Sequence, residues 1–306
     1  MRVRVLGSAA GGGFPQWNCG CPNCDGLRNG TVRALPRTEA SLAIQAGDGT
    51  WFLIHATPDV RSQLARLPDL QPRTERDFRI AGILLTNADL DQCLGLFCLR
   101  ESQPLHLYAT ESVRRALTDG NPFYEALERM PGQVTWHEVK LEAEQPLFGQ
   151  GTSPSLLVTP IAVPGKPPLY RRTDPALATP DVNVALLIRD PLDGRVLGHA
   201  PCVGRRSASV DRVLEEADCL FFDGTFWSED ELPALGIGTR SASDMAHWPV
   251  GGPNGSLAVL SQARASRKFL IHVNNTNPLL RDDSLPRRLA EAAGVEMAWD
   301  GMEVRV

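Results

Sequence analysis

Residues 84–96 read Leu84-Leu85-Thr86-Asn87-Ala88-Asp89-Leu90-Asp91-Gln92-Cys93-Leu94-Gly95-Leu96. The apolar run Ile80 to Leu85 predicts a short buried strand, and Asp91 to Leu99 predicts a helix directly after it. Asp91 suits the N-cap of that helix, because a carboxylate can accept hydrogen bonds from the free N–H groups of the first turn. The polar residues between strand and helix therefore either cap the helix only or also line a site at the edge of a sheet.

The rest of the chain divides into two groups of strands, each ending with helices. The turns Gly47-Asp48-Gly49 and Asp193-Gly194 each predict a β-hairpin. This order favours an α/β fold with two mixed β-sheets packed face to face and helices on the outside, in a single domain spanning residues 1–306. Strands are predicted at Val3–Leu6, Ser41–Ala46, Trp51–His55, Leu105–Tyr108, Val134–Val139, Leu156–Val163, Val184–Arg189, Val196–Gly198, Cys219–Phe222, Phe269–Val273, Glu296–Ala298 and Met302–Val306. Helices are predicted at Val60–Arg66, Val113–Leu117, Phe123–Arg129, Val210–Ala217, Ser256–Ala265 and Leu285–Ala293.

Composition argues against two classes of partner. The 306 residues carry 31 basic and 36 acidic side chains, a net charge of -5, so we expect no nucleic acid partner. No apolar run approaches the length of a membrane span, and the N-terminus lacks the apolar core of an export signal. We therefore expect a cytoplasmic protein without a membrane partner. The oligomeric state stays open, with a homodimer as one alternative.

Three of the seven cysteines fall within six residues, in Cys19-Gly20-Cys21-Pro22-Asn23-Cys24. Thiolates at this spacing can share one zinc ion, and three of them nearly complete a tetrahedral structural site. We therefore predict a structural zinc held by Cys19, Cys21 and Cys24; the alternative is three free cysteines in a loop. The other cysteines, which lie on apolar elements, are predicted to be core residues: Cys93, Cys98, Cys202 and Cys219.

The strand-to-helix junction resembles the metal-binding motif of the metallo-β-lactamase superfamily, Thr-His-x-His-x-Asp-His-x-x-Gly-Leu. The four ligand positions read Asn87, Asp89, Asp91 and Gln92, so only the third matches. The resemblance implies a metallo-β-lactamase-type αββα sandwich. Because no pair of histidines has His-x-His spacing, a di-zinc hydrolase is not expected, and at most one active-site metal is predicted.

The remaining site candidates lie near predicted strand ends. His272 follows an apolar strand at the place of the superfamily's last metal-binding histidine, and we predict it as a metal ligand with Asp91, Asp89 and Gln92. Asp91, His247 and Asp223 are predicted as catalytic residues, although a loop histidine and a turn-capping aspartate would look the same. His55, Asp59 and His199 are also expected near this cleft.

Four side chains are candidates for binding a carboxylate-rich substrate: Lys166, Arg171, Asn274 and Asn275. Basic side chains bind carboxylates through charge-assisted hydrogen bonds. The alternative for Lys166 and Arg171 is a solvated loop.

Motifs along nearly the whole chain resemble the pyrroloquinoline quinone (PQQ) biosynthesis protein B family. They are residues 6–19, 57–61, 163–166, 222–225, 245–247 and 271–278, the last reading Ile271-His272-Val273-Asn274-Asn275-Thr276-Asn277-Pro278. The resemblance implies a role in making PQQ, through iron-dependent hydroxylation of a tyrosine-derived ring in a crosslinked Glu–Tyr intermediate. Fe(II) would then be the active-site cofactor and a small peptide-derived molecule the substrate. The alternative is a non-catalytic carrier that binds PQQ or a precursor.

Two residues depart from the family pattern. Gln92 stands where members usually have histidine, which removes a probable iron ligand, and His55 stands where asparagine is more frequent. The chain also resembles a phosphodiesterase of the carbon–phosphorus lyase pathway, which shares the cysteine cluster. In that relative the fourth zinc ligand is a histidine at the position of Asn275, so the fourth ligand in this chain is left open.

Overall fold

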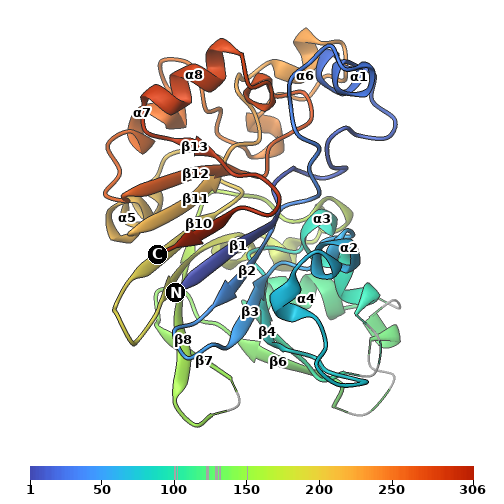
Figure 1. The fold of residues 1–306 in the computed structure, drawn as a ribbon, viewed down its shortest axis with the longest axis vertical. Helices are drawn as coiled ribbons and strands as arrows, with labels where there is room; N and C mark the ends of the chain where they lie inside the picture. Colours follow the sequence, from blue (N-terminus) through green and yellow to red (C-terminus); the bar gives the residue numbers. More distant parts are fainter. Residues whose placement is uncertain (100, 102, 122–123, 128–129, 131, 150) are drawn as a thin grey trace.

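Two seven-stranded β-sheets face each other in the computed structural model, which describes residues 1–99, 101, 103–121, 124–127, 130, 132–149 and 151–306. Helices lie on the outer faces of both sheets (Figure 1). Both sheets contain parallel and antiparallel pairs, which confirms the predicted α/β sandwich of two mixed sheets.

The first sheet has the strand order β14-β1-β2-β3-β4-β5-β6. Its central strands are almost continuously apolar, as expected for strands covered on both faces. The pairs from β3 to β6 are parallel, so these strands present their carboxyl ends at one edge. The bounds are β1 Arg2–Gly7, β2 Ser41–Gln45, β3 Trp51–Ile54, β4 Ile80–Leu84, β5 Leu105–Ala109, β6 Val134–Glu138 and β14 Glu303–Arg305.

The second sheet has the order β13-β12-β11-β10-β9-β8-β7, and its pairs from β10 to β13 are parallel. Strand β7 escaped prediction because Leu147 is its only buried residue, which leaves no clear hydrophobic pattern. The bounds are β7 Gln145–Phe148, β8 Pro154–Ala162, β9 Val184–Arg189, β10 Val196–Ala200, β11 Cys219–Asp223, β12 Arg267–Ile271 and β13 Glu296–Met297.

The α-helices are α1 Pro22–Asn29, α2 Val60–Ala65, α3 Leu90–Cys93, α4 Glu111–Thr118, α5 Ala208–Glu216, α6 Glu231–Ala234, α7 Ser256–Leu260 and α8 Leu285–Ala292. Short 3₁₀ turns lie at Pro68–Leu70, Leu94–Cys98, Tyr124–Ala126, Leu169–Arg171, Pro175–Leu177, Pro180–Val182, Ser243–Met245 and Pro278–Leu280. Within the described ranges, no helix combines the length and apolar character needed to span a bilayer.

Several predicted helices differ from those observed. The helix after β4 is divided into α3 and the turn Leu94–Cys98, and Asp89 rather than Asp91 is its N-cap, so the prediction that Asp91 caps this helix is wrong. The helix predicted from Ser256 ends at Leu260. The one predicted at Phe123–Arg129 lies partly outside the described residues, and its described part contains the turn Tyr124–Ala126.

The core between the sheets fixes how their edges meet. Ile54 and Leu84 from the first sheet share one buried cluster with Leu186, Phe221 and Ile271 from the second. Each is at most 1% exposed, so the hydrophobic effect holds the two sheets together here. Since Ile54, Leu84 and Ile271 are the last residues of β3, β4 and β12, the packing brings those strand ends to a common edge.

Candidate functional site

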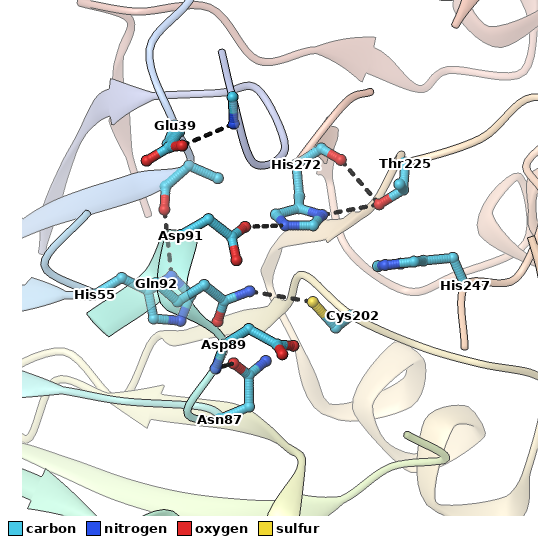
Figure 2. A network of polar contacts seen from close by, with 12 residues as sticks. Glu39, His55, Asn87, Asp89, Asp91, Gln92, Cys202, Thr225, His247 and His272 are labelled. Atoms are coloured by element: carbon cyan, nitrogen blue, oxygen red, sulfur yellow. Dashed lines mark hydrogen bonds and ion pairs between the residues drawn. The ribbon is translucent and has the colours of Figure 1, made fainter. Parts of the chain in front are cut away.

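Polar side chains from five strand ends meet at this edge, and Figure 2 labels members of this group other than Asp223. His55 follows β3, residues 87–92 follow β4, Cys202 follows β10, Asp223 ends β11 and His272 follows β12. His55, Asn87, Gln92, Cys202, Asp223 and His272 are buried, whereas Asp89 and Asp91 are partly buried. The predicted residues Asp91, Asp89, Gln92, His272, His247 and Asp223 are therefore brought together.

His272 and Asp91 form the centre of the site. Nε2 of His272 lies 2.9 Å from Oδ2 of Asp91, and Nδ1 lies 2.8 Å from the hydroxyl of Thr225. Burial opposes protonation of His272, but the hydrogen bond with Asp91 and its charge outweigh burial and raise the pKa of the imidazole. The same pairing keeps the pKa of Asp91 below its usual range, although partial burial acts to raise it. Each residue of the pair thus favours the charged form of the other.

Asp223 orients both histidines of the site. Its Oδ2 lies 2.7 Å from Nδ1 of His247, and its Oδ1 accepts a 2.7 Å hydrogen bond from Thr225 Oγ1. Thr225 in turn contacts His272. Burial acts to raise the pKa of Asp223. The charge and hydrogen bond of His247 outweigh burial, so the pKa lies below its usual value. Because Nδ1 of each ring is engaged, Nε2 of each is the atom presented to a ligand.

Cys202 joins the two histidines in a cluster of potential metal ligands. One donor atom each from Cys202, His247 and His272 lie within 4.8 Å of one another, and the two imidazole rings stack with centroids 5.4 Å apart. Sequence reasoning placed Cys202 in the apolar core. The residue is buried, but its sulfur faces the polar site, and no local pattern signalled this because its partners come from other strands.

Gln92 is held in a chain of hydrogen bonds that ends at Cys202. His55 Nε2 lies 2.9 Å from Thr86 Oγ1, and Thr86 donates to Gln92 Oε1 at 3.0 Å. Gln92 Nε2 then donates to Cys202 Sγ at 3.1 Å (Figure 2). Burial lowers the pKa of His55 to about 4, so its ring is neutral at physiological pH. Gln92 therefore reaches the site by its hydrogen bond to the sulfur of Cys202.

Asp89 and Asn87 complete the turn after β4. The Asn87 side chain accepts the N–H of Asp89 at 2.9 Å and donates to Asn183 at 3.3 Å, so it has a structural role in the loop. Burial and, after it, the negative charge of Asp91 raise the pKa of Asp89 to about 6. Asp89 thus changes its protonation state near neutral pH.

Backbone strain is concentrated at the site. Three of the four described non-glycine residues with positive φ lie in or next to it: His55 at 69°, His272 at 60° and Ala246, before His247, at 61°. Left-handed backbone costs an ordinary residue on the order of 1 kcal/mol or more. Its occurrence at these histidines means that the surrounding packing imposes their positions.

His199, in β10, lies beside His55. Its ring is completely buried, its two nitrogens have no hydrogen-bond partner among the described residues, and its centroid is 5.4 Å from that of His55. Burial lowers its pKa well below the usual value, so the ring is neutral. The expectation that it lies near the cleft agrees with this placement.

The cysteine cluster forms a second centre. Donor atoms of Cys19, Cys21 and Cys24 lie within 4.8 Å of one another. Cys21 is the N-cap of α1, with Pro22 in the first turn, so the motif itself begins a helix that sequence reasoning took for a loop. The side-chain amide of Asn275 faces all three sulfurs, 3.1 Å from Cys19, 3.7 Å from Cys21 and 3.3 Å from Cys24.

The predicted substrate residues are spread over different places. Lys166 Nζ donates to the carbonyl of Asp244 at 3.3 Å, three residues before His247, and Lys166 and Asp89 attract each other electrostatically. Arg171 instead forms an ion pair with Asp174 at 2.6 Å. Asn274 donates to Thr276, and Asn275 belongs to the cysteine cluster.

Comparison with known proteins identifies the family. Residues 50–273 match the beta-lactamase superfamily domain. The chain is 43% identical to coenzyme PQQ synthesis protein B of Azotobacter vinelandii and 44% identical to that of Azoarcus sp. (strain BH72), over 99% of each chain. The chain belongs to the coenzyme PQQ synthesis protein B family.

Solved structures agree with this assignment. The Zn²⁺-bound PqqB from Methylobacterium extorquens superposes with a TM-score of 0.91 at 35% identity, over 100% of both chains. A diphosphatase of the PhnP family superposes with a TM-score of 0.67 at 20% identity, covering 99% of this chain and 97% of the other, and shares the fold alone. The expected PqqB membership and metallo-β-lactamase fold are confirmed.

Proposed function

We propose that this PqqB-family chain acts in PQQ synthesis as an iron-dependent hydroxylase of the tyrosine-derived ring in a crosslinked Glu–Tyr intermediate. Family membership supports the pathway. The observation that carries the chemistry is the convergence of His247, His272 and Asp91 at one buried edge. Two imidazoles and one carboxylate with open positions are the ligand set of non-haem Fe(II) oxygenases.

The spacing of His272 and Asp91 fits two neighbouring ligands of one ion. The 2.9 Å between His272 Nε2 and Asp91 Oδ2 is the separation of neighbouring ligands whose bonds to a metal are about 2.1 Å long. Thr225 and Asp223 bind the Nδ1 atoms of the two rings, so both rings can offer Nε2. Such outer contacts fix the tautomer and direction of metal-binding histidines.

In the proposed reaction, one oxygen atom of O₂ is inserted into a ring C–H bond, and the other leaves as water with two protons and two electrons from an external reductant. Bound iron would supply the activation of O₂. Asp89, with its pKa of about 6, is placed to accept or return a proton near neutral pH. Lys166 is the candidate to bind a substrate carboxylate, because its ammonium group donates to the carbonyl of Asp244, three residues before His247, and is attracted by Asp89.

We further propose a structural zinc at the cysteine cluster. Three thiolates match the soft, tetrahedral preference of zinc and leave no open position for a substrate plus water. The Asn275 side chain occupies the fourth direction, and its amide oxygen would reach the ion after rotation about Cβ–Cγ. Because Cys21 starts α1 while Asn275 follows β12, one ion would connect the N-terminal loop to the second sheet.

Oxygen uptake tests the proposed activity. The protein, reconstituted with Fe(II) without oxygen, is mixed with air-saturated buffer, a reductant and a crosslinked Glu–Tyr peptide. Uptake coupled to ring hydroxylation is expected for the wild type and for His106→Ala, a change on an exposed histidine, but not for His272→Ala. If the iron-loaded wild type binds the peptide or PQQ without turnover, the carrier function is favoured instead.

A further inference from the structure

We propose that Cys202 binds the active-site metal through its thiolate and takes the coordination position that an imidazole at residue 92 would fill. This inference rests on the proposed metal site at His247, His272 and Asp91. It assigns a sulfur ligand to that site and explains how a chain with Gln92 can still hold an ion there.

The first support is the position of the sulfur. One donor atom each of Cys202, His247 and His272 lie within 4.8 Å of one another. Bonds of about 2.3 Å to sulfur and about 2.1 Å to nitrogen place such atoms ~3.5 to 4.4 Å apart around one ion, which lies inside that limit. The thiol therefore needs only small side-chain movement to coordinate.

The second support is what residue 92 does in this chain. Its amide nitrogen donates to Cys202 Sγ at 3.1 Å, while Thr86 holds its amide oxygen. The side chain of Gln92 thus ends at the sulfur and orients it, as outer-shell donors orient thiolate ligands. A histidine at position 92 would project its ring into the space that the amide group and the sulfur share.

The third support is the charge around the sulfur. Burial and the negative charges of Asp223, Asp89 and Asp91 all oppose a thiolate at Cys202 unless a cation lies beside it. Buried carboxylates of one sign need a cation for compensation. The core cysteine Cys219 differs, because it lies in the apolar cluster between the sheets with Leu197 as its partner on β10, and it serves as a matched control.

Cobalt absorption tests the ligand directly. Protein with zinc in the cysteine cluster is titrated with one equivalent of Co(II), and zinc retention is checked by elemental analysis. We expect a thiolate-to-cobalt charge-transfer band in the near ultraviolet for the wild type and Cys219→Ser. Cys202→Ser should lose the band and bind Co(II) at least about tenfold more weakly. A band of full intensity in Cys202→Ser, with zinc retained, would overturn the proposal.

The reciprocal substitution tests the replacement of ligands. In a Gln92→His background, Cys202→Ser should bind Co(II) without the sulfur band and with affinity recovered to within about threefold of the wild type. Failure of this double variant to recover binding, while circular dichroism shows it folded, would refute the exchange between positions 92 and 202. If Cys202→Ser alone does not fold, Cys202→Ala is measured in the same two backgrounds.

The cobalt experiment tests the thiolate ligand independently of the proposed hydroxylation, because cobalt absorption requires no turnover. Loss of hydroxylation with an intact sulfur band would reject the proposed reaction and leave the thiolate ligand in place. Hydroxylation without a Cys202-dependent band would support the proposed reaction and reject the thiolate ligand.

Discussion

Removing the Thr225 hydroxyl should weaken both the fold and the metal site. Thr225 is 2% exposed, and its Oγ1 lies 2.7 Å from Asp223 Oδ1, 2.8 Å from His272 Nδ1 and 2.9 Å from the His272 carbonyl. Thr225→Val keeps the shape and removes these contacts. Asp223 Oδ1 keeps the N–H of Thr225, so the largest loss falls on His272.

The magnitude follows from the number and type of the lost contacts. A hydrogen bond to a charged group is worth roughly 1.5–3 kcal/mol, and a buried imidazole nitrogen left without a partner costs about 1–3 kcal/mol. We expect Thr225→Val to lower the free energy of unfolding by about 2–3 kcal/mol. Since outer-shell substitutions usually cost 10–100-fold in metal affinity, Fe(II) binding should fall by about that factor.

Thr225→Ser is the matched control, because it keeps the hydroxyl and loses one methyl group, worth about 0.8 kcal/mol. Urea unfolding and anaerobic Fe(II) titration of both variants give the comparison. Equal stability and equal iron affinity of the Val and Ser variants would refute the role of this hydroxyl in holding His272.

Three further substitutions test other parts of the account. Cys21→Ser should lose the bound zinc and lower the melting temperature; a full zinc equivalent at an unchanged melting temperature would contradict the structural role. Burial raises the pKa of Glu231 to about 7, above its unfolded value of 4.5. The folded state therefore holds a proton that the unfolded chain releases, and stability is lost as the pH rises from about 4.5 through 7. Urea melts at pH 5.5 and 8 should show Glu231→Gln gaining stability relative to the wild type at the higher pH, whereas the exposed Glu215→Gln should not; parallel pH profiles would contradict the assignment. Lys166→Gln should raise the KM for a carboxylate substrate, while Arg171→Gln, removed from the site by its pairing with Asp174, should leave KM unchanged; the opposite order would exchange their roles.

Much of the fold could be predicted because its signals are local. The apolar run before Asn87 and the Gly-Asp-Gly turn after β2 define strands without reference to the rest of the chain. Strand β7 and helix α1 carried no such signal: β7 buries one residue, and α1 begins inside a motif dominated by its cysteines.

The site was predictable to the extent that its residues follow strands directly. His272, Asp91 and Asp223 were predicted in this way, and the structure places them in one network of contacts. Cys202 was missed because a cysteine after an apolar strand looks like a core residue. Its contact with Gln92 joins the segment after β10 to the segment after β4, so only the folded structure shows it. The pairing of Arg171 with Asp174 likewise depends on the backbone of a loop whose sequence has no hydrophobic periodicity.

Metal-resolved crystallography tests the central claim most directly. Crystals of protein reconstituted with zinc and then with Fe(II), measured at both absorption edges, should show zinc at Cys19, Cys21 and Cys24. Iron should lie between His247, His272 and Asp91, with Cys202 Sγ at bonding distance. Iron confined to the cysteine cluster, or no iron peak beside His272 after full loading, would contradict the account.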